Sequence, residues 1–517
     1  SYGQLVIDGS NSPAEWSDLA TNNLSPAEVQ IAENQGILVQ NGGEFTISFG
    51  PTVKNIQRSI EVESGGILNL ERGFQLLVAA NLYNSGILNI SQTGVEVLGS
   101  SNTGDFVTFH SGSVTNISSS GKLKFRSTIN SVLIEDASAG GSIPAAVLNL
   151  TNGFIESRSP DTEIQGNING TLSILTFYDD VIFSKSGTLS LSGIVVATGI
   201  GSQIQAFEDV TVVDNYTMNL NQTKGEFLGN LNLGVGCTMN FTTASNVELG
   251  FPSKSVVISG EMYLENSPTL LEASIVDLRG KLSFDGASLC LRNLLHLKES
   301  AKLIGKDATF NFLQDAEIRL GATCGSTIDC ENTTFSPKNT GETWKGITSD
   351  YNVLCNTITS QYAVDPSVDN NGNCSKEEWE GVLNLEVSLV KLSGCTIENA
   401  LIGLDADGEA NVFNSVANRG GTIFRVRETT FIDCQKGIRI KDYSNPNGDP
   451  NASFIMTCNF NTTDAFPFDK QQLVHIELDN LGESGVNIGG CIFTNSNNMP
   501  EQDAERGTGI KIYKASV

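Results

Sequence analysis

Basic residues are scarce in this sequence. Lys and Arg number 31 against 58 Asp and Glu, so the formal net charge is −27 although only 17 % of the residues are charged. Nucleic acids and anionic membranes bind proteins through clustered cations, so we expect neither as a partner. No apolar run approaches the roughly eighteen residues that cross a bilayer, and no basic segment followed by an apolar core opens the chain. We therefore expect a soluble chain from which any export signal has been removed.

Histidine and cysteine are too few and too scattered for most metal and nucleophile chemistry. The 3 His residues, at His110, His296 and His475, lie far apart in sequence, which leaves little for His-activated catalysis or metal ligation. The 10 Cys residues include no C-x-x-C pair with zinc spacing, and they are too sparse for a disulfide scaffold. These residue types therefore predict no resident cofactor.

A short glycine-based phrase returns about every twenty-one residues. It reads "GGILNL" at 65–70, "SGILNI" at 85–90, "NGTLSI" at 169–174 and "SGTLSL" at 186–191, and continues as "LGNLNL" to Leu233, "SGEMYL" to Leu264 and "RGKLSF" to Phe284. Self-similarity at this spacing is typical of a solenoid, in which each repeat buries its apolar face against its neighbours.

Apolar residues alternate inside this phrase, which indicates strands and not helices. We expect these pairs to face the interior: Leu68 and Leu70, Leu88 and Ile90, Leu172 and Ile174, Leu189 and Leu191, Leu231 and Leu233, Met262 and Leu264, and Leu282 and Phe284. The intervening residues Asn69, Asn89, Ser173, Ser190, Asn232 and Ser283 are polar and are expected on the solvent side. The predicted fold is all-β, a single right-handed parallel β-helix with a short N-terminal cap; some twenty coils would span roughly 100 Å.

The chain is expected to contain three segments along this β-helix. Residues 1–60 form the cap and first coils, 61–320 form compact coils, and 321–517 continue with longer loops. "SPAE" occurs at Ser12–Glu15 and Ser25–Glu28, and both copies fit a helical capping box, so one or two short helical turns should close the end. The second copy is also readable as the lead into a strand. Because the chain stops within a repeat, we predict that the natural protein continues into more coils and a sorting domain.

Three cysteines occupy equivalent positions in the later repeats. Cys395, Cys458 and Cys491 stand in "SGCTI", "MTCNF" and "GGCIF". Buried unpaired cysteine behaves as a small hydrophobic residue, so we predict thiols stacked inside successive coils. A functional thiol site is the alternative.

The last third of the chain resembles the right-handed parallel β-helix repeat family. The pattern of that family is a small residue or Cys, a Thr or Asn, an apolar residue, a short corner and then Gly-Ile. The matches here are Cys395, Ile397, Gly403 and Leu404; Thr430, Phe431, Gly437 and Ile438; and Cys491, Ile492, Gly509 and Ile510. Two phrases, "TWKGI" with Trp344 and "EWEGV" with Trp379, resemble exported bacterial surface proteins and adhesins carried by type IX secretion. We expect both Trp side chains to wedge against the coil; the alternative is a pair of stacking platforms for sugars.

Carboxylates after residue 320 are the candidates for catalysis. A glycosidase needs two carboxylates facing one groove at about 5–10 Å. Asp405 and Asp407 should share a strand face, and Asp433 should lie one coil away. A solvated loop in "DADGEA" is the alternative interpretation. The Gly-His-Gly of polygalacturonase-like enzymes is missing from the sequence, and the acidic, Lys-poor composition argues against a polyuronate lyase.

A weak calcium candidate lies in "SVDNNGNCSKEE". Asp369, Asn371 and Glu378 take positions that ligate calcium in an EF-hand loop, but Ser367 stands where Asp is expected. An ordinary Asn/Gly turn is the alternative.

The same region contains a candidate disulfide. Cys355 and Cys374 flank "DPSVDNNGN" and could close that loop, which would indicate an oxidising, exported location.

Two functions of different class remain open. The first is a secreted or cell-surface structural or adhesive protein, such as a stalk, filament component or adhesin. Its partners would be secretion machinery or other surface components, glycans or other cells, and it could assemble into larger structures. The second is a carbohydrate-active enzyme, a glycoside hydrolase or polysaccharide lyase, with its site after residue 320. A host-type extracellular glycoprotein is a third, less favoured possibility.

Overall fold

The computed structural model describes most of the chain. The described residues are 4–10, 14–17, 26–100, 104–138, 141–193, 201–243, 245–298, 300–321, 326–349, 388–407, 422–441, 453–468, 473–479, 481, 486–495 and 507–513. They divide into two compact units: unit 1 (Ser1–Lys254 and Gly260–Tyr263) and unit 2 (Ser255–Ser259 and Leu264–Val517). No helix among the described residues has both the length and the apolar character needed to cross a membrane.

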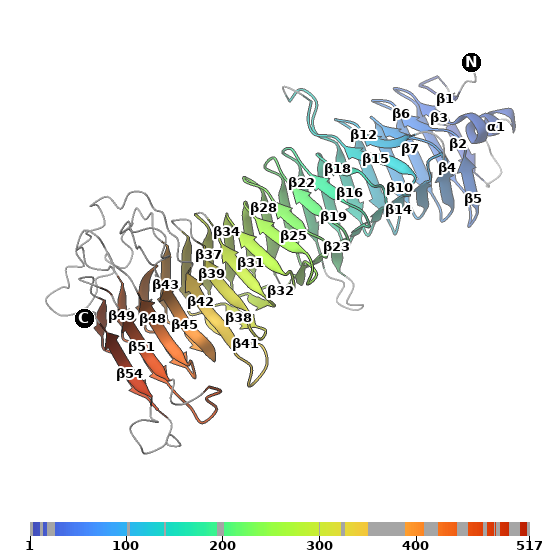
Figure 1. The fold of residues 1–517 in the computed structure, drawn as a ribbon. Coiled ribbons are helices and arrows are strands. Elements are labelled where there is room, and N and C mark those ends of the chain that lie inside the picture. The colour runs from blue at the N-terminus through green and yellow to red at the C-terminus, as the bar shows by residue number, and fades with distance from the viewer. Residues whose placement is uncertain are drawn as a thin grey trace. The chain divides into compact units, whose positions relative to one another are not determined.

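Unit 1 is a right-handed parallel β-helix, in which successive strands contribute in turn to three parallel sheets, A, B and C (Figure 1). Sheet A contains β1 (Leu5–Ile7), β3 (Ile37–Val39), β6 (Ile60–Val62), β9 (Leu82–Asn84), β12 (Asp105–Phe109), β15 (Ile129–Ile134), β18 (Thr162–Ile164), β21 (Val181–Phe183), β24 (Val210–Val212) and β27 (Leu231–Leu233). Sheet B contains β2 (Ala14–Ser17), β4 (Glu44–Ser48), β7 (Ile67–Glu71), β10 (Ile87–Ser91), β13 (Val114–Ser118), β16 (Val147–Thr151), β19 (Asn167–Thr171), β22 (Thr188–Ser192), β25 (Thr217–Asn221) and β28 (Thr238–Thr242). Sheet C contains β5 (Val53–Ile56), β8 (Gln75–Val78), β11 (Gly94–Val97), β14 (Lys122–Phe125), β17 (Phe154–Ser157), β20 (Ile174–Phe177), β23 (Ser202–Ala206), β26 (Thr223–Phe227) and β29 (Val247–Leu249).

Unit 2 has the same three-sheet construction, which confirms the predicted all-β, parallel β-helical fold class. Sheet A contains β30 (Ser255–Ile258), β33 (Ile275–Leu278), β36 (Leu294–Leu297), β39 (Glu317–Leu320), β42 (Trp344–Ser349), β45 (Ala400–Asp407), β48 (Lys436–Lys441), β51 (Val474–Asp479) and β54 (Thr508–Tyr513). Sheet B contains β34 (Lys281–Asp285), β37 (Lys302–Lys306), β40 (Thr327–Glu331), β43 (Leu389–Ser393), β46 (Ile423–Arg427), β49 (Phe454–Met456) and β52 (Asn487–Gly489). Sheet C contains β32 (Pro268–Leu271), β35 (Ser288–Leu291), β38 (Thr309–Phe312), β41 (Thr334–Pro337), β44 (Thr396–Glu398), β47 (Thr430–Ile432), β50 (Asn459–Asn461) and β53 (Ile492–Thr494). Strand β31 (Glu261–Glu265) includes residues of both units.

Every second residue along a strand faces inward, and these residues form the interior. Leu88 of β10 is the register partner of Leu68 in β7, and both are fully buried. Six of the seven predicted inward pairs are buried in this way; they are Leu68 and Leu70, Leu88 and Ile90, Leu189 and Leu191, Leu231 and Leu233, Met262 and Leu264, and Leu282 and Phe284. Stacked apolar side chains therefore fill the coils, and removal of this surface from water stabilises them.

The predicted inward pair Leu172 and Ile174 is wrong. The phrase "NGTLSI" spans a corner, because Leu172 has a φ of 54° and connects β19 to β20. Leu172 and Ile174 are half-buried, whereas Ser173 between them is fully buried. Ser173 was expected in solvent, as was Ser283, which is also buried. At Ser173 the corner shifts the alternation by one residue, so the inside and outside assignments reverse there. Ser283 lies within β34 between the buried Leu282 and Phe284, so no such shift accounts for its burial.

Many corners from sheet B to sheet C share one design. A residue with positive φ, such as Asn332 (48°) or Glu428 (51°), is followed by a buried Thr333 or Thr429. Each Thr hydroxyl donates a hydrogen bond to the carbonyl two residues earlier, at 3.0 Å and 2.9 Å respectively. The buried hydroxyl thus gives a hydrogen-bond partner to a backbone carbonyl that faces the interior at the corner.

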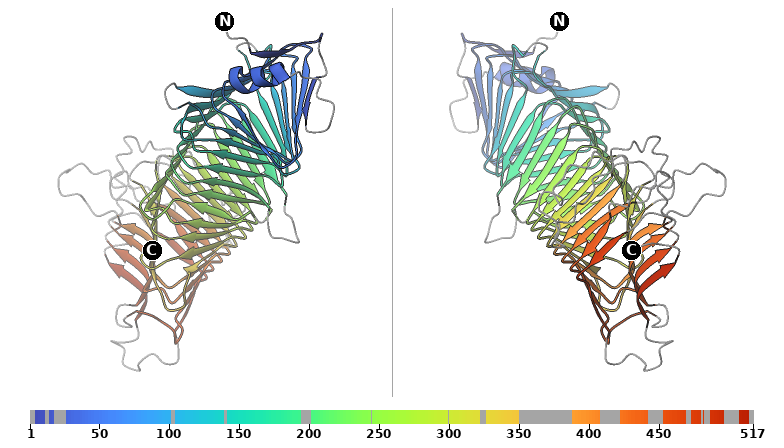
Figure 2. Two further views of the ribbon diagram at one scale, coloured as in Figure 1. Left: turned by 90° about the vertical axis from the view of Figure 1, so that its right-hand side faces the viewer. Right: turned by 90° about the vertical axis from the view of Figure 1, so that its left-hand side faces the viewer.

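A helix accompanies the first coils of unit 1. Helix α1 (Pro26–Gln35) begins within the second "SPAE" and lies beside β1 and β5 (Figure 2). Its Ala32 is fully buried, as expected for a cap. The first "SPAE" does not form a helical turn: its Ala14 and Glu15 belong to strand β2, which pairs with β4. Trp16 in the same strand is buried, and this apolar anchor favours a strand over a helix at that site.

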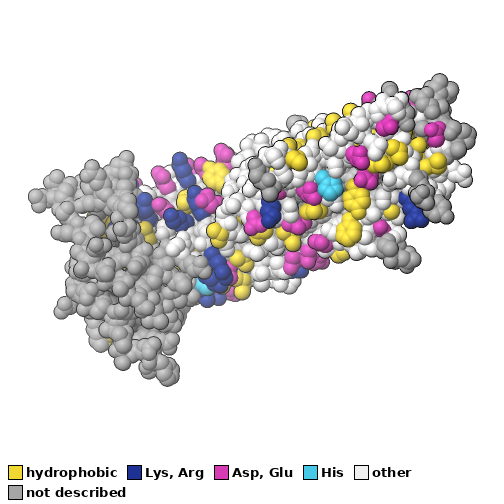
Figure 3. Space-filling model, turned by 90° about the horizontal axis from the view of Figure 1, so that it is seen from above, with side chains coloured by type: hydrophobic (Ala, Val, Ile, Leu, Met, Phe, Trp, Pro, Cys, Tyr) yellow, Lys and Arg dark blue, Asp and Glu magenta, His cyan; other side chains and the backbone are white. Residues whose placement is uncertain are grey.

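A ladder of asparagines runs along the outer face of sheet B in unit 1. Asn89 donates to Asn69 at 2.8 Å, Asn116 to Asn89 at 2.8 Å, Asn149 to Asn116 at 3.0 Å, and Asn169 to Asn149 at 3.2 Å. Each inner amide therefore donates and accepts within the ladder. Two of the predicted solvent-side asparagines, Asn69 and Asn89, are bonded to each other. On the face of unit 1 that Figure 3 shows, backbone and side chains that are neither charged nor hydrophobic cover most of the surface.

Breaking this ladder in its middle should destabilise unit 1. Asn116→Ala removes one donor and one acceptor, so we expect the free energy of unfolding to fall by about 1–2 kcal/mol, measured by urea denaturation. Asn169→Ala is the matched control, because Asn169 is exposed and ends the ladder; its loss should stay within about 0.5 kcal/mol. Equal effects of the two variants would contradict the cooperative ladder.

Candidate functional site

A continuous row of polar and charged residues follows the outer face of sheet A in unit 2. We call it the charged row. Each member is the register partner of the next: Asp277, His296, Arg319, Thr348, Asp405, Arg439, Glu477 and Lys511. Neighbouring positions such as Leu404, Ile438 and Ile476 are fully buried in the interior. Because parallel strands are about 4.8 Å apart, consecutive members lie within reach of direct contact.

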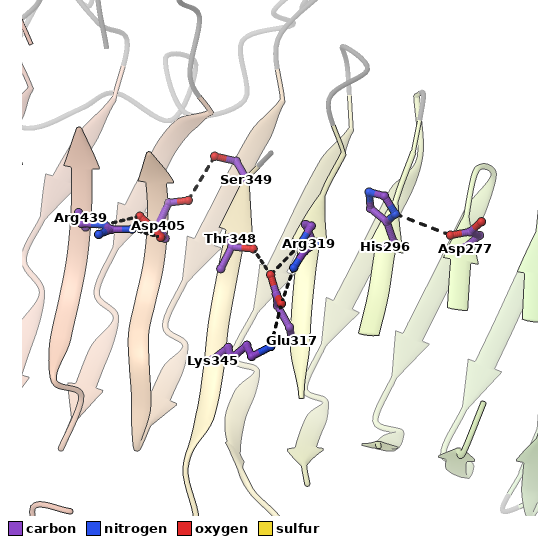
Figure 4. Close-up of polar contacts among 9 residues, drawn as sticks. All are labelled: Asp277, His296, Glu317, Arg319, Lys345, Thr348, Ser349, Asp405 and Arg439. Atoms are coloured by element: carbon purple, nitrogen blue, oxygen red, sulfur yellow. Dashed lines mark hydrogen bonds and ion pairs between the residues drawn. The ribbon is translucent and has the colours of Figure 1, made fainter. Parts of the chain in front are cut away.

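The centre of the charged row is a two-pronged ion pair. Arg439 of β48 donates from Nε to Asp405 Oδ1 at 2.7 Å and from Nη2 to Asp405 Oδ2 at 2.6 Å (Figure 4). The side chains are 21 % and 10 % exposed, so the pair is largely shielded from water. Ser349 donates to the backbone carbonyl of Asp405 at 3.3 Å. This two-point geometry fixes the orientation of the Asp405 carboxylate against Arg439.

A second cluster surrounds Glu317 of β39. Arg319 donates to both Glu317 oxygens at 2.8 Å, Thr348 donates to Oε1 at 2.5 Å, and Lys345 Nζ lies 3.8 Å from Oε2 (Figure 4). Burial opposes ionisation of Glu317, but the hydrogen bonds from Arg319 and Thr348 and the nearby charges outweigh it. The pKa of Glu317 therefore lies below its usual value.

The two ends of the charged row are paired in the same manner. Glu477 accepts hydrogen bonds from Lys436 and, at 3.0 Å, from Lys511. Burial opposes its ionisation, yet these two bonds leave the pKa of Glu477 below its usual value. At the other end Asp277 accepts a hydrogen bond from Lys298 at 2.7 Å, and His296 Nδ1 lies 3.7 Å from it (Figure 4).

This arrangement is poorly suited to acid–base catalysis. A general acid at neutral pH needs a raised carboxyl pKa, whereas Glu317 and Glu477 are shifted in the opposite direction. Each described carboxylate of the row, together with Glu317, is also held by at least one cation. Within the described part of the chain, no three His, Cys, Asp or Glu side chains are grouped to hold a metal ion.

The structure places the predicted catalytic carboxylates in different surroundings. Asp405 is in the charged row, and Asp407 ends β45 opposite Lys441. Asp433 occupies a corner with a φ of 53°, where its buried carboxylate accepts from Thr463 N at 2.6 Å and Oγ1 at 2.5 Å. Arg439, the register partner of Asp405, comes three residues after β48 begins, whereas Asp433 precedes that strand. The backbone positions of the two aspartates are therefore offset by roughly 10 Å or more along sheet A.

Glu398, a carboxyl group that the sequence did not single out, has a pKa shifted in the opposite direction to those of Glu317 and Glu477. Burial, and then the charge of Asp433, raise the pKa of Glu398 at the end of β44. A raised pKa is the direction of shift that a carboxyl group needs in order to act as a general acid. The sequence contained no sign of this, because Glu398 and Asp433 meet only when two coils stack.

The other predicted site residues fall into two groups. Trp344 is fully buried, stacks on Phe312 with ring centroids 3.8 Å apart, and donates from Nε1 to the Glu398 carbonyl at 2.8 Å. The prediction that it wedges against the coil is confirmed. The calcium candidates Asp369, Asn371 and Glu378, the cysteines Cys355 and Cys374, and Trp379 lie outside the described residues.

Unit 2 contains a buried histidine, His475. His475 in β51 is 4 % exposed, lies 5.8 Å from Phe460 and 5.7 Å from Phe493 between ring centroids, and contacts Asn495 Oδ1 through Nε2 at 3.1 Å. Burial lowers the pKa of His475, and the contact with Asn495 offsets this only in part. The unfolded chain therefore binds a proton more readily than the folded one below about pH 6.5.

The free energy of unfolding of unit 2 should consequently fall as pH is lowered from 7 to 5. His475→Phe keeps the aromatic stack and removes the titrating group, so its stability should fall less over the same range. Urea unfolding at pH 7, 6 and 5 measures how the free energy of unfolding of each protein depends on pH. Because groups such as Glu398 titrate in both proteins, their contribution cancels in the difference between the two slopes. Identical slopes would show that His475 does not titrate differently in the folded state.

Comparison of the sequence with protein-family models, with curated proteins and with solved structures found no match. The class of protein is therefore defined by the parallel β-helical fold alone, a fold that serves structural and surface proteins as well as enzymes such as lyases.

Proposed function

We propose that this chain is a structural or adhesive β-helical protein, secreted or held at the cell surface as a stalk, filament component or adhesin. The observation that carries the proposal is the charged row. Asp405 with Arg439, Glu317 with Arg319, and Glu477 with Lys511 neutralise one another. Among the described residues of the charged row, the carboxylates are thus paired with cations and none is poised for catalysis.

The asparagine ladder of unit 1 supports the same proposal. Ladders of identical or complementary side chains stabilise a lateral surface continuously, coil after coil, which suits a protein whose work depends on length. Partners in this role are surface or secretion components, glycans or other cells, and neighbouring copies in a larger assembly. The resemblance to type IX surface proteins and adhesins points the same way, and it is part of the proposal.

The test combines location with activity. Antibodies to the purified protein should label intact producing cells or their medium, and the protein should turn over no substrate in a panel of neutral and acidic polysaccharides. Antigen confined to the interior of the cells would contradict the surface role. Turnover in the panel would contradict the structural role.

A carbohydrate-active enzyme is the second candidate, and the raised pKa of Glu398 favours it. If the panel reveals turnover, Glu398→Gln should abolish it when Glu398 is the acid. Asp405→Asn combined with Asp407→Asn should abolish turnover if the charged row carries the site instead. A Gln substitution at the exposed residue Glu261, in the compact coils, is the control and should leave the rate unchanged.

A further inference from the structure

Two cysteines are direct neighbours in successive coils of unit 2. Met456 is the register partner of Gly489, and Asn459 is the register partner of Ile492. Cys458 and Cys491 stand between these pairs, at the same corner from sheet B to sheet C. Register partners of parallel strands are about 4.8 Å apart, which is within the Cα separation that a disulfide spans.

The two thiols also point to the same place. Cys458 Sγ contacts the Met456 carbonyl at 3.3 Å, and Cys491 Sγ contacts the equivalent Gly489 carbonyl at 3.6 Å. Interaction with the neighbouring Cys458 side chain lowers the pKa of the Cys491 thiol from its usual value. Both cysteines are unbridged in this structure, Cys458 fully buried and Cys491 partly exposed.

We propose that Cys458 and Cys491 are a redox-active pair that closes to a disulfide and links two successive coils of unit 2. The co-reactant is a low-molecular-weight or protein disulfide. The partly exposed Cys491 thiolate attacks one sulfur of that disulfide, which forms a mixed disulfide and releases one thiol. Cys458 then attacks Cys491 Sγ, loses its proton and releases the second thiol. Two protein thiols are oxidised and one external disulfide is reduced to two thiols.

The other described cysteines provide internal controls. Cys395 occupies the same corner position two coils from Cys458, but the intervening position holds Thr429, so a separation of roughly 10 Å prevents a bridge. Cys434 is buried at the corner between β47 and β48, which is a different corner from the one that holds Cys458 and Cys491. Reaction should therefore be selective for Cys458 and Cys491.

Serine variants at this corner should fold normally. Thr333 and Thr429 already fill the equivalent position and donate to the same backbone carbonyl as the cysteine thiols do. Cys458→Ser and Cys491→Ser thus preserve the corner hydrogen bond and remove only the redox chemistry.

The experiment treats the folded full chain with oxidised glutathione, alkylates remaining thiols in denaturant, and maps tryptic peptides without reduction. Cleavage at Lys441, Lys470 and Arg506 separates the two cysteines into peptides 442–470 and 471–506, each with a single Cys. We expect these two peptides to be recovered as one linked species, and peptides 392–419 and 428–436, which carry Cys395 and Cys434, to be alkylated.

The variants decide the order of attack. Cys458→Ser should leave glutathione attached to peptide 471–506, whereas Cys491→Ser should leave peptide 442–470 alkylated and unlinked. Oxidation should raise the melting temperature of the unchanged chain and leave that of Cys458→Ser where it was. The proposal would be overturned if Cys458 and Cys491 were both recovered as alkylated thiols. It would also be overturned if either were linked to Cys395 or Cys434 as often as Cys458 and Cys491 are linked to each other. Its failure would leave the proposed function untouched, because neither cysteine belongs to the charged row.

Discussion

Replacing Arg439 by methionine is expected to lower the free energy of unfolding of unit 2 by about 3–5 kcal/mol. The substitution keeps most of the side-chain volume but leaves the Asp405 carboxylate, only 10 % exposed, without its two hydrogen bonds. A buried charge without a partner costs far more than the net contribution of the pair. The buried Trp344 gives a fluorescence signal within unit 2 that follows urea unfolding.

The matched control replaces both partners. Asp405→Leu combined with Arg439→Met removes both charges, and much of the lost stability should return, because apolar groups of similar volume replace the pair at little cost. A double variant as unstable as Arg439→Met alone would show that the loss comes from packing. If Arg439→Met lowers the free energy of unfolding by less than about 1 kcal/mol, the ion pair contributes no more than a solvent-exposed pair does. That result would contradict its burial.

The second large effect is expected from Trp344→Ala, which should destabilise unit 2 by about 3–5 kcal/mol. Trp344 is fully buried against Phe312 and bonds the carbonyl of Glu398, so truncation opens a cavity and leaves that carbonyl without its indole donor. Circular dichroism during urea denaturation measures the loss without relying on the tryptophan signal.

Trp344→Phe separates the two contributions. It keeps an aromatic ring beside Phe312 and removes the indole N–H, so we expect a loss of only about 1–2 kcal/mol. If Ala and Phe cost the same, the hydrogen bond and not the stack would dominate. If Trp344→Ala hardly changes the free energy of unfolding, Trp344 must be exposed, and a role in stacking against sugars would again be open for this residue.

The alternation of apolar residues was enough to predict the β-helix, because stacking of strands leaves a period of two in every repeat. Leu68 and Leu70 illustrate this, since they have the same pattern as their partners one coil later. Leu172 shows the limit of the approach. An apolar residue rarely takes positive φ, so nothing in "NGTLSI" marked the corner, and the position of a corner decides which residues face inward.

The charged row could not be predicted from the sequence for a different reason. Asp405 and Arg439 are 34 residues apart, and the connections between sheet A strands in this part of the chain differ widely in length. No fixed period relates members of the row, so their contact depends on register set by the core. Glu398 and Asp433 likewise become neighbours only through coil stacking.

A crystal structure of the chain would test the stacked parallel register most directly, at a resolution that places side-chain amides. We predict Leu88 beside Leu68 in the interior, Asn116 between Asn89 and Asn149 on the outer face, and Arg439 across two oxygens of Asp405. Antiparallel pairing of these strands, or a register shifted by one residue that turns Leu88 outward, would contradict the fold and every proposal that rests on it.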